Sequence, residues 1–208
     1  MNTEGLISII KNIAEKIDME KDFLGELDSF IGDGDHGINM ARGFNEVKKK
    51  LPEFSSLEPA ELLKSVGMTL VATVGGASGP LYGTAFMKAG AALKGKENFD
   101  INDFVPALEL AIEGIMKRGR STQGEKTMLD SMIPSLTALK TSLANGDDSI
   151  TALREAVAAA EDGVYYTKTI AATKGRASYL GVRSIGYQDP GATSYKMIIE
   201  SVYETLKQ

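Results

Sequence analysis

The stretch Ser29-Phe-Ile-Gly-Asp-Gly-Asp-His-Gly-Ile-Asn39 separates two helical patterns and contains several side chains that can bind a metal or transfer a proton. It holds Asp33, Asp35 and the only histidine, His36, among three glycines, and Asp28 lies just before it. Because glycine adopts positive φ at little cost, short carboxylates in such a loop can turn toward one point. Three carboxylates at one point repel each other unless a hard cation lies between them, and oxygen ligands suit Mg²⁺ or Ca²⁺. The loop therefore predicts a metal and phosphate site.

Two other interpretations of this acidic loop compete with a metal site. Asp-Gly pairs are common in turns, so the carboxylates could serve only as caps. An EF-hand would need a bidentate Glu at its twelfth position, but counting from Asp33 that position is Phe44, which excludes the calcium loop. His36 has the chemistry of a general base, a phosphate contact or a phosphohistidine carrier, or it simply hydrogen-bonds a carboxylate. The nearby carboxylates disfavour a phosphohistidine because it would crowd negative charges together.

Outside the loop, apolar residues recur at helical spacing almost everywhere, as in Leu6, Ile9, Ile10, Ile13 and Ile17. The pattern predicts helices over about 3–17, 19–27, 37–50, 62–74, 78–93, 102–117, 128–143, 149–173 and 195–206, with N-caps expected at Thr3, Ser78, Asn102 and Ser149. Pro52 is expected in a connection and Pro134 inside a helix, and a long loop is expected over 174–191. No run alternates as a strand does. The sequence predicts one all-α domain over 1–208, with about eight or nine helices.

Composition and charge narrow the class of protein. The chain is 43% hydrophobic and 25% charged, with a formal net charge of −5, which argues against binding to nucleic acid or to an anionic membrane surface. It has no cysteine, so thiolate chemistry and zinc-thiolate clusters are excluded. We expect a cytoplasmic protein, because no signal-peptide pattern and no apolar run of about 20 residues is present.

Three further loops carry features that suit a phosphate ligand. Gly75–Pro80 precedes a helix, and the unpaired N–H groups of a helix N-terminus favour phosphate. Gly119–Thr127 is a near miss for a P-loop, because Glu125 intrudes before the lysine and a helix, not a strand, precedes it. A Walker fold is therefore excluded, but the loop stays a candidate nucleotide contact. Met128 could press on an adenine ring, and Arg176 could neutralise a diphosphate; core packing and a surface ion pair are the alternatives.

Taken together, these segments resemble the DhaL family, the nucleotide-binding L subunits of dihydroxyacetone kinases. The matching positions fall in order and cover nearly the whole chain: Asp28, Gly32–Asn39, Arg42-Gly43, Gly67–Thr69, Val74–Pro80, Arg118-Gly119, Lys126–Met128, Lys174–Tyr179 and Asp189–Ala192. The resemblance implies a single-domain barrel of eight antiparallel helices, with tightly bound ADP or ATP and two Mg²⁺ at one end.

The resemblance also assigns site residues. It implies Mg²⁺ ligation by Asp28, Asp33 and Asp35. It places the phosphates and metals against His36, Gly37, Ile38 and Asn39, with Ala77 and Ser78 at the helix start. The adenine side would be lined by Gly119 and Met128, and the nucleotide would be closed over by Arg176, Asp189, Pro190 and Gly191. The loop from Ser121 to Glu125 departs from the family pattern, so adenine contacts there are less secure.

The function that the resemblance implies is phosphotransfer without a covalent intermediate on this chain. Bound ADP would accept phosphate from a phosphohistidine of DhaM, which belongs to the phosphotransferase system, and the ATP formed would phosphorylate dihydroxyacetone held on DhaK. The absence of a fused substrate domain in this sequence favours this form. Two alternatives stay open. The first is an ATP-dependent L subunit or a relative that phosphorylates another acceptor. The second is a regulatory module that senses Mg-ADP and signals to a transcription factor.

Overall fold

The computed structural model describes residues 1–208, and every regular element in it is a helix. Along the chain the elements are α1 (Thr3–Met19), α2 (Lys21–Ile31), α3 (His36–Phe54), α4 (Pro59–Thr73), α5 (Ser78–Ala92), α6 (Ile101–Gly119), α7 (Leu129–Ala144), α8 (Ser149–Thr167), the 3₁₀-helix η1 (Arg176–Ser184) and α9 (Pro190–Leu206). The all-α prediction is confirmed, and the helix count agrees with the apolar periodicity.

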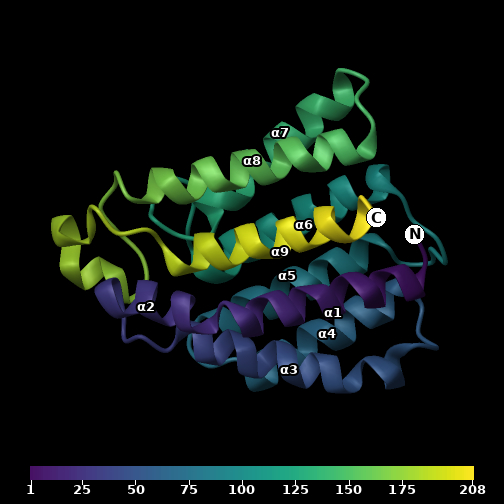
Figure 1. The fold of residues 1–208 in the computed structure, drawn as a ribbon, viewed down its shortest axis with the longest axis horizontal. Helices are drawn as coiled ribbons and strands as arrows, with labels where there is room; N and C mark the ends of the chain where they lie inside the picture. The colour runs from purple at the N-terminus through teal and green to yellow at the C-terminus, as the bar shows by residue number, and fades with distance from the viewer.

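Eight of the helices close into a ring. The ring runs α1, α3, α4, α5, α6, α7, α8, α9 and back to α1, each helix contacting the next (Figure 1). Neighbours run antiparallel, so this is the expected eight-helix barrel. The ninth helix, α2, lies across one end, where it contacts α3, α9 and η1, while both chain termini lie at the opposite end (Figure 1).

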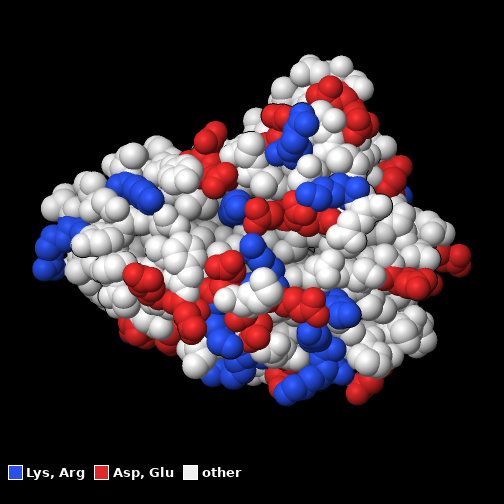
Figure 2. Space-filling view, viewed as in Figure 1, with Lys and Arg blue, Asp and Glu red and all other residues white.

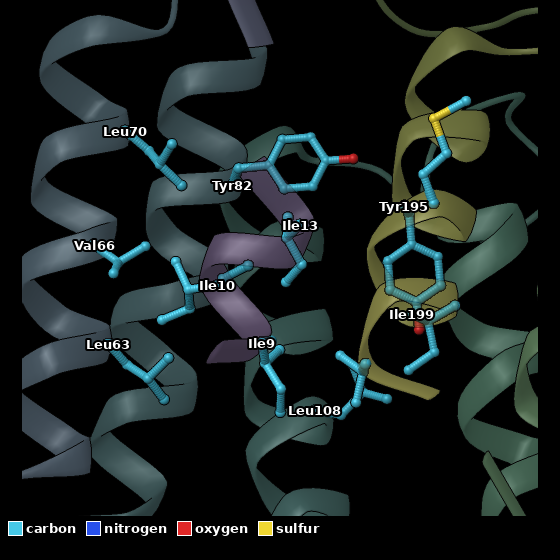
Figure 3. Close-up of a cluster of buried hydrophobic side chains, with 14 of the residues drawn as sticks. Ile9, Ile10, Ile13, Leu63, Val66, Leu70, Tyr82, Leu108, Tyr195 and Ile199 are labelled. Carbon is cyan, nitrogen blue, oxygen red and sulfur yellow. The ribbon is translucent and has the colours of Figure 1, made fainter. Parts of the chain in front are cut away.

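The barrel is closed by apolar side chains that point to a common interior. One cluster of 38 buried residues joins the helices, and Figure 3 shows part of it, with side chains from α1, α4, α5 and α9 facing one another. Fully burying a side chain such as Phe44 or Leu70 contributes about 1.5–3 kcal/mol. The interior keeps a cavity of about 360 Å³, and 25 of its 27 lining residues are apolar. Tyr82 lines this cavity on one side and a polar cleft on the other.

The helix starts differ from the predicted ones in four places. The N-caps are Asn2, Ala77, Asp100 and Asp148, in place of Thr3, Ser78, Asn102 and Ser149. Asp100 forms a capping box with Asp103, and Asp148 accepts two N–H groups of the first turn. In three of the four cases a carboxylate or amide one or two residues before the predicted cap accepts the exposed N–H groups, because its oxygen reaches the second or third helical residue. Ser78 instead begins α5, and its hydroxyl hydrogen-bonds elsewhere.

Three predicted boundaries were wrong. Helix α3 continues through Pro52 to Phe54; a proline so near the C-terminus removes only one of the last helical hydrogen bonds. Helix α8 ends at Thr167, not near Thr173, although the alanine-rich pattern continues toward the longer bound. The long loop before α9 contains η1, a short tight helix that leaves no apolar periodicity to detect.

The surface mixes charges of both signs. Figure 2 shows Lys and Arg interspersed with Asp and Glu over the middle of one face, while the end near η1 is mostly uncharged, with a few basic groups. None of the helices combines the length and apolar content that a bilayer-spanning segment needs.

Candidate nucleotide and metal site

The acidic loop closes on itself at the end of the barrel. Asp28 comes from the last turn of α2, and Asp33 and Asp35 lie in the connection to α3. Oxygens of the three carboxylates lie within 4.8 Å of one another. The Asp28 carboxylate also accepts hydrogen bonds from the backbone N–H groups of Asp35 at 2.9 Å and His36 at 3.1 Å. Gly34, at φ +75°, supplies the left-handed turn that brings the later carboxylates back toward Asp28.

This donor set fits a hard divalent cation. All three ligand groups are carboxylates, which suit Mg²⁺ or Ca²⁺ better than the softer transition metals. Only one cationic side chain lies against the cluster: Arg176, whose Nη2 is 2.9 Å from Asp33 Oδ2. Arg176 is largely exposed and so screens the carboxylates weakly. A surplus of negative charge is left at the point where the three oxygens meet.

His36 is buried and hydrogen-bonded on both sides of its ring. Nδ1 lies 3.1 Å from Ser78 Oγ, and Nε2 lies 3.0 Å from Ser194 Oγ, which in turn lies 2.7 Å from the hydroxyl of Tyr82. Burial lowers the pKa of His36 to about 4, although Asp28 pulls it upward, so the imidazole is neutral near pH 7. In this arrangement His36 orients Ser78 and has no free ring nitrogen for a ligand.

The opposite wall of the cleft is the start of α5. The turn Gly75–Ala77 leads into this helix, and Ala77 and Ser78 both line the cleft. No side chain caps this N-terminus, so its N–H groups stay available to an anion. Asn39 also lines the cleft, where its Oδ1 accepts a hydrogen bond from Arg42 at 2.7 Å. A helix N-terminus therefore faces the acidic cluster, with room for a ligand between them.

The remaining walls come from the far half of the chain. Gly119 ends α6, Met128 precedes α7 and is buried, and both line the cleft. Arg176 lies at the start of η1, and Asp189, Pro190 and Gly191 form the start of α9. The cleft so enclosed has a volume of about 410 Å³, the size of a small-molecule site.

Asp189 is the N-cap of α9 and carries an unusual carboxyl group. Its Oδ2 accepts the N–H of Ala192 at 2.7 Å, and its own N–H donates to Thr167 Oγ1 at 2.9 Å. Burial nevertheless raises the pKa of Asp189 to about 7, a tendency that the Ala192 hydrogen bond opposes and nearby Asp130 reinforces. Helix α9 begins at Pro190, before the predicted start near 195, because proline at the first helical position has no N–H left without a partner.

Thirteen of the fifteen predicted site residues line this one cleft; Gly37 and Ile38 do not. Gly37 packs against α2 so tightly that a Cβ there would lie 1.8 Å from the Lys21 carbonyl oxygen. The side chain of Ile38 is 63% exposed, on the outside of α3. Their nucleotide contacts stay a prediction, as do the individual roles of the other residues.

Several residues in the cleft or directly behind it were not predicted from the sequence. Tyr82 and Ser194 complete the hydrogen-bond chain to His36, yet they lie far from it in sequence and leave no local motif. Lys126 belongs to a segment that matched the family, but its pattern gave no reason to expect a buried side chain. Arg118 and Lys174 also line the cleft, and both stand in matched segments, which was the only signal for them.

Comparisons with known proteins show the family of the chain. The model of the DAK2 domain matches residues 30–204. The chain is 43% identical over 196 residues to the ADP-binding subunit DhaL of PEP-dependent dihydroxyacetone kinase 1 from Listeria innocua, covering 94% of this chain and 93% of that protein. It is 38% identical over 189 residues to the Escherichia coli ADP-binding subunit DhaL, covering 91% and 90%.

A solved structure has the same fold. The dihydroxyacetone kinase from C. freundii in complex with AMP-PNP and Mg²⁺ aligns with a TM-score of 0.73 at 27% identity. The alignment covers 95% of this chain and 33% of that longer one. Helical fold, matched domain and near full-length identity to curated subunits all agree, and the chain therefore belongs to the DhaL family of dihydroxyacetone kinase subunits, which are components of a phosphotransferase.

Proposed function

We propose that this chain, as a single domain over 1–208, binds Mg-ADP in the cleft and retains it as a coenzyme for phosphotransfer. The observation that carries the proposal is the meeting of the Asp28, Asp33 and Asp35 carboxylates within 4.8 Å, opposite the uncapped N-terminus of α5. A cation site and an anion site facing each other suit a metal-bound diphosphate. The C. freundii relative was solved with AMP-PNP and Mg²⁺, which supports this ligand class.

In this proposal each wall of the cleft binds a different part of Mg-ADP. The three carboxylates hold Mg²⁺, with two ions expected, and the metal supplies neutralisation of phosphate charge when it is bound. The N–H groups at the start of α5 and the Ser78 hydroxyl, which His36 orients, hold phosphate oxygens. Arg176 provides a guanidinium beside Asp33, at the phosphate end, while Met128 contributes an apolar contact for the adenine ring.

The chain needs no nucleophile of its own for this chemistry. Phosphoryl transfer depends mainly on positioning and charge neutralisation, which a rigid cleft supplies. The cleft offers no thiol, and the His36 ring is engaged at both nitrogens. The curated relatives are named PEP-dependent or PTS-dependent ADP-binding subunits. We therefore infer that phosphate arrives from a phosphohistidine on a cytoplasmic DhaM subunit and passes to dihydroxyacetone on DhaK.

The first experiment tests the cleft. We expect the purified chain to carry bound ADP and Mg²⁺, and Asp33→Asn to lose both. Asp162→Asn is the matched control, because Asp162 is an exposed acid on α8 that does not line the cleft. Retention of ADP by Asp33→Asn at the level of the control would contradict the assignment of the metal site.

The second experiment identifies the phosphate donor. Phospho-DhaM carrying ³²P is added to the ADP-loaded chain with excess unlabelled ATP in solution, followed by DhaK and dihydroxyacetone. Label should reach dihydroxyacetone phosphate without dilution by the bulk ATP. Transfer only from free ATP would favour the ATP-dependent alternative. Bound ADP with no transfer from either source would favour the module that senses Mg-ADP for a transcription factor.

A further inference from the structure

A buried ammonium group joins two segments that line the cleft. Lys126 lies between α6 and α7, in the connection 120–128, and its residue is only 1% exposed. Its backbone has φ +60°, a left-handed conformation that costs a residue with a side chain about 1–2 kcal/mol. Such a conformation persists only where the surroundings require it. The contacts of the Lys126 side chain show what the requirement is.

The Lys126 ammonium donates to three backbone carbonyls. Its Nζ hydrogen-bonds the carbonyl oxygens of Thr167, of Ile170 at 3.4 Å and of Tyr187 at 2.5 Å. An ammonium has three N–H donors, so all of them are used. Thr167 is the last residue of α8, where the helix dipole places partial negative charge. Carbonyl dipoles thus compensate the buried charge and hold the lysine in one geometry.

Two of these carbonyls lie on either side of η1, at the neck of the segment 168–189. Ile170 precedes η1 and Tyr187 follows it. The ammonium therefore joins the stretch of backbone that leads into η1 to the stretch that leads out of it. A backbone hydrogen bond from Gly186 to Lys168, at 2.8 Å, crosses the same neck. In Figure 1 the segment 168–189 projects at the end of the molecule beyond α8. Lys126 therefore clamps the base of the segment.

The clamp is anchored on the barrel. The buried carboxylate of Asp130, in the first turn of α7, accepts the N–H groups of Gly124 at 2.5 Å and Thr127 at 2.8 Å. These two bonds hold the backbone on both sides of Lys126, while its side chain extends away into the neck. The barrel end of α7 and the segment 168–189 are connected through this one side chain.

We propose that Lys126 is a positioning residue that controls how long the cleft retains its nucleoside diphosphate. By clamping the neck, it sets the positions of Arg176, at the start of η1, and of Asp189, at the end of the clamped segment; both residues line the cleft. The inference rests on the proposed function, because it takes the ligand to be Mg-ADP. Loss of the ammonium frees the segment and opens the cleft, whereas the carboxylates and the start of α5 lie outside the clamp and stay in place.

The test compares Lys126→Met with Lys168→Met. Lys168 is on the same segment, but its ammonium lies over the ring of Tyr165 at the surface and takes no part in the clamp. ADP dissociation from each Mg-ADP complex is measured by displacement, and amide hydrogen exchange is measured without nucleotide. We expect Lys126→Met to release ADP faster, on the order of tenfold or more, as for the loss of a hydrogen bond from a charged group. Amides of 168–189 should exchange faster, with α1 and α4 unchanged.

The absence of cysteine allows the charge itself to be restored. In Lys126→Cys, the only thiol is alkylated in urea with bromoethylamine, which rebuilds an ammonium side chain, or with iodoacetamide, which gives a neutral one. Wild-type protein passes through the same unfolding and refolding. The aminoethylated protein should recover slow ADP release and slow exchange over 168–189, and the neutral product should not. Equal behaviour of the two products would overturn the proposal.

A measurement on the wild-type chain decides the matter if the variants do not refold. Because binding linkage is reciprocal, Mg-ADP should slow the exchange of the Lys126 ammonium protons observed by NMR. Equal rates with and without Mg-ADP, or wild-type ADP release from a folded Lys126→Met, would refute the coupling. A wild-type chain that binds no ADP would refute the proposed function instead, while unchanged exchange over 168–189 in nucleotide-free Lys126→Met would refute the clamp separately.

Discussion

The raised pKa of Asp189 leads to a specific pH dependence of stability. The carboxyl has a pKa of about 7 in the folded chain and an ordinary value of 3.8. Between these values the native state holds a proton that the unfolded state has released. The free energy of unfolding therefore falls as pH rises through this window and levels off above pH 7. Asp189→Asn, which keeps a side-chain oxygen for the Ala192 N–H but cannot ionise, should remove this dependence.

The magnitude follows from the size of the pKa shift. A pH of 5 is about two units below the pKa of the native carboxyl. The free energy of unfolding of wild type should therefore fall by about 2.5 kcal/mol, relative to that of Asp189→Asn, between pH 5 and pH 8. The figure is an upper bound because Asp189 keeps partial solvent contact, which screens its charge. Burial gives the opposite slope for His36: its lowered pKa makes stability rise with pH from about 4 to 6.5. The comparison with Asp189→Asn cancels that contribution.

The assay is urea unfolding of the nucleotide-free chain, followed by circular dichroism, at pH 5, 6, 7 and 8. Both proteins are measured at each pH, and the difference between their free energies of unfolding is plotted. We expect the free energy of unfolding of wild type to fall relative to that of Asp189→Asn from pH 5 to 7, with only a small further fall at pH 8. A difference that stays constant over the whole range would show that Asp189 ionises normally, and the reasoning from its burial would be wrong.

Three further outcomes follow from the structure. Chelation with EDTA should release ADP and lower the Tm of the loaded chain; a ligand present at about 100 times its Kd contributes about 2.7 kcal/mol, so an unchanged Tm would argue against metal-held nucleotide. Ser194→Ala should cost about 1–3 kcal/mol in urea unfolding, because it leaves His36 Nε2 buried without a partner; a neutral effect would show that the ring is satisfied otherwise. Gly37→Ala should destabilise the chain by about 1–3 kcal/mol, because a Cβ would collide with the Lys21 carbonyl, and ADP affinity should fall as α2 shifts with Asp28; wild-type stability would mean that α2 yields freely.

Much of the fold was predictable because helices are local. The apolar period of residues such as Ile9, Ile13 and Ile17 depends only on neighbours within two turns, and the structure buries these side chains as the period requires. The helix caps were less predictable, because a Ser or Asn at one position competes with an Asp a residue or two earlier. Asp100 prevailed over Asn102, and Asp148 over Ser149, since the carboxylate at the earlier position reaches two N–H groups at once.

Part of the candidate site was likewise predictable from the local sequence, and part was not. Asp28, Asp33 and Asp35 were found because they stand within eight residues of one another, with two glycines between them, a short-range arrangement that the sequence displays directly. The match to a family then placed the more distant walls of the cleft. It did not reveal that the His36 ring is engaged at both nitrogens, because the partner hydroxyls of Ser78 and Ser194 belong to two other helices.

By itself, then, the order of amino acids determined the helical class, the acidic loop and the family, since each depends on side chains close together in the chain. Only the closed barrel decided which groups are buried: it encloses the Lys126 ammonium and raises the pKa of Asp189. It also turns Ile38 outward, although the residue stands inside the most informative motif. The physical reason is that desolvation and long-range hydrogen bonds join segments far apart in the chain, 41 residues between Lys126 and Thr167 and 158 between His36 and Ser194, and these meet only when the ring of helices closes.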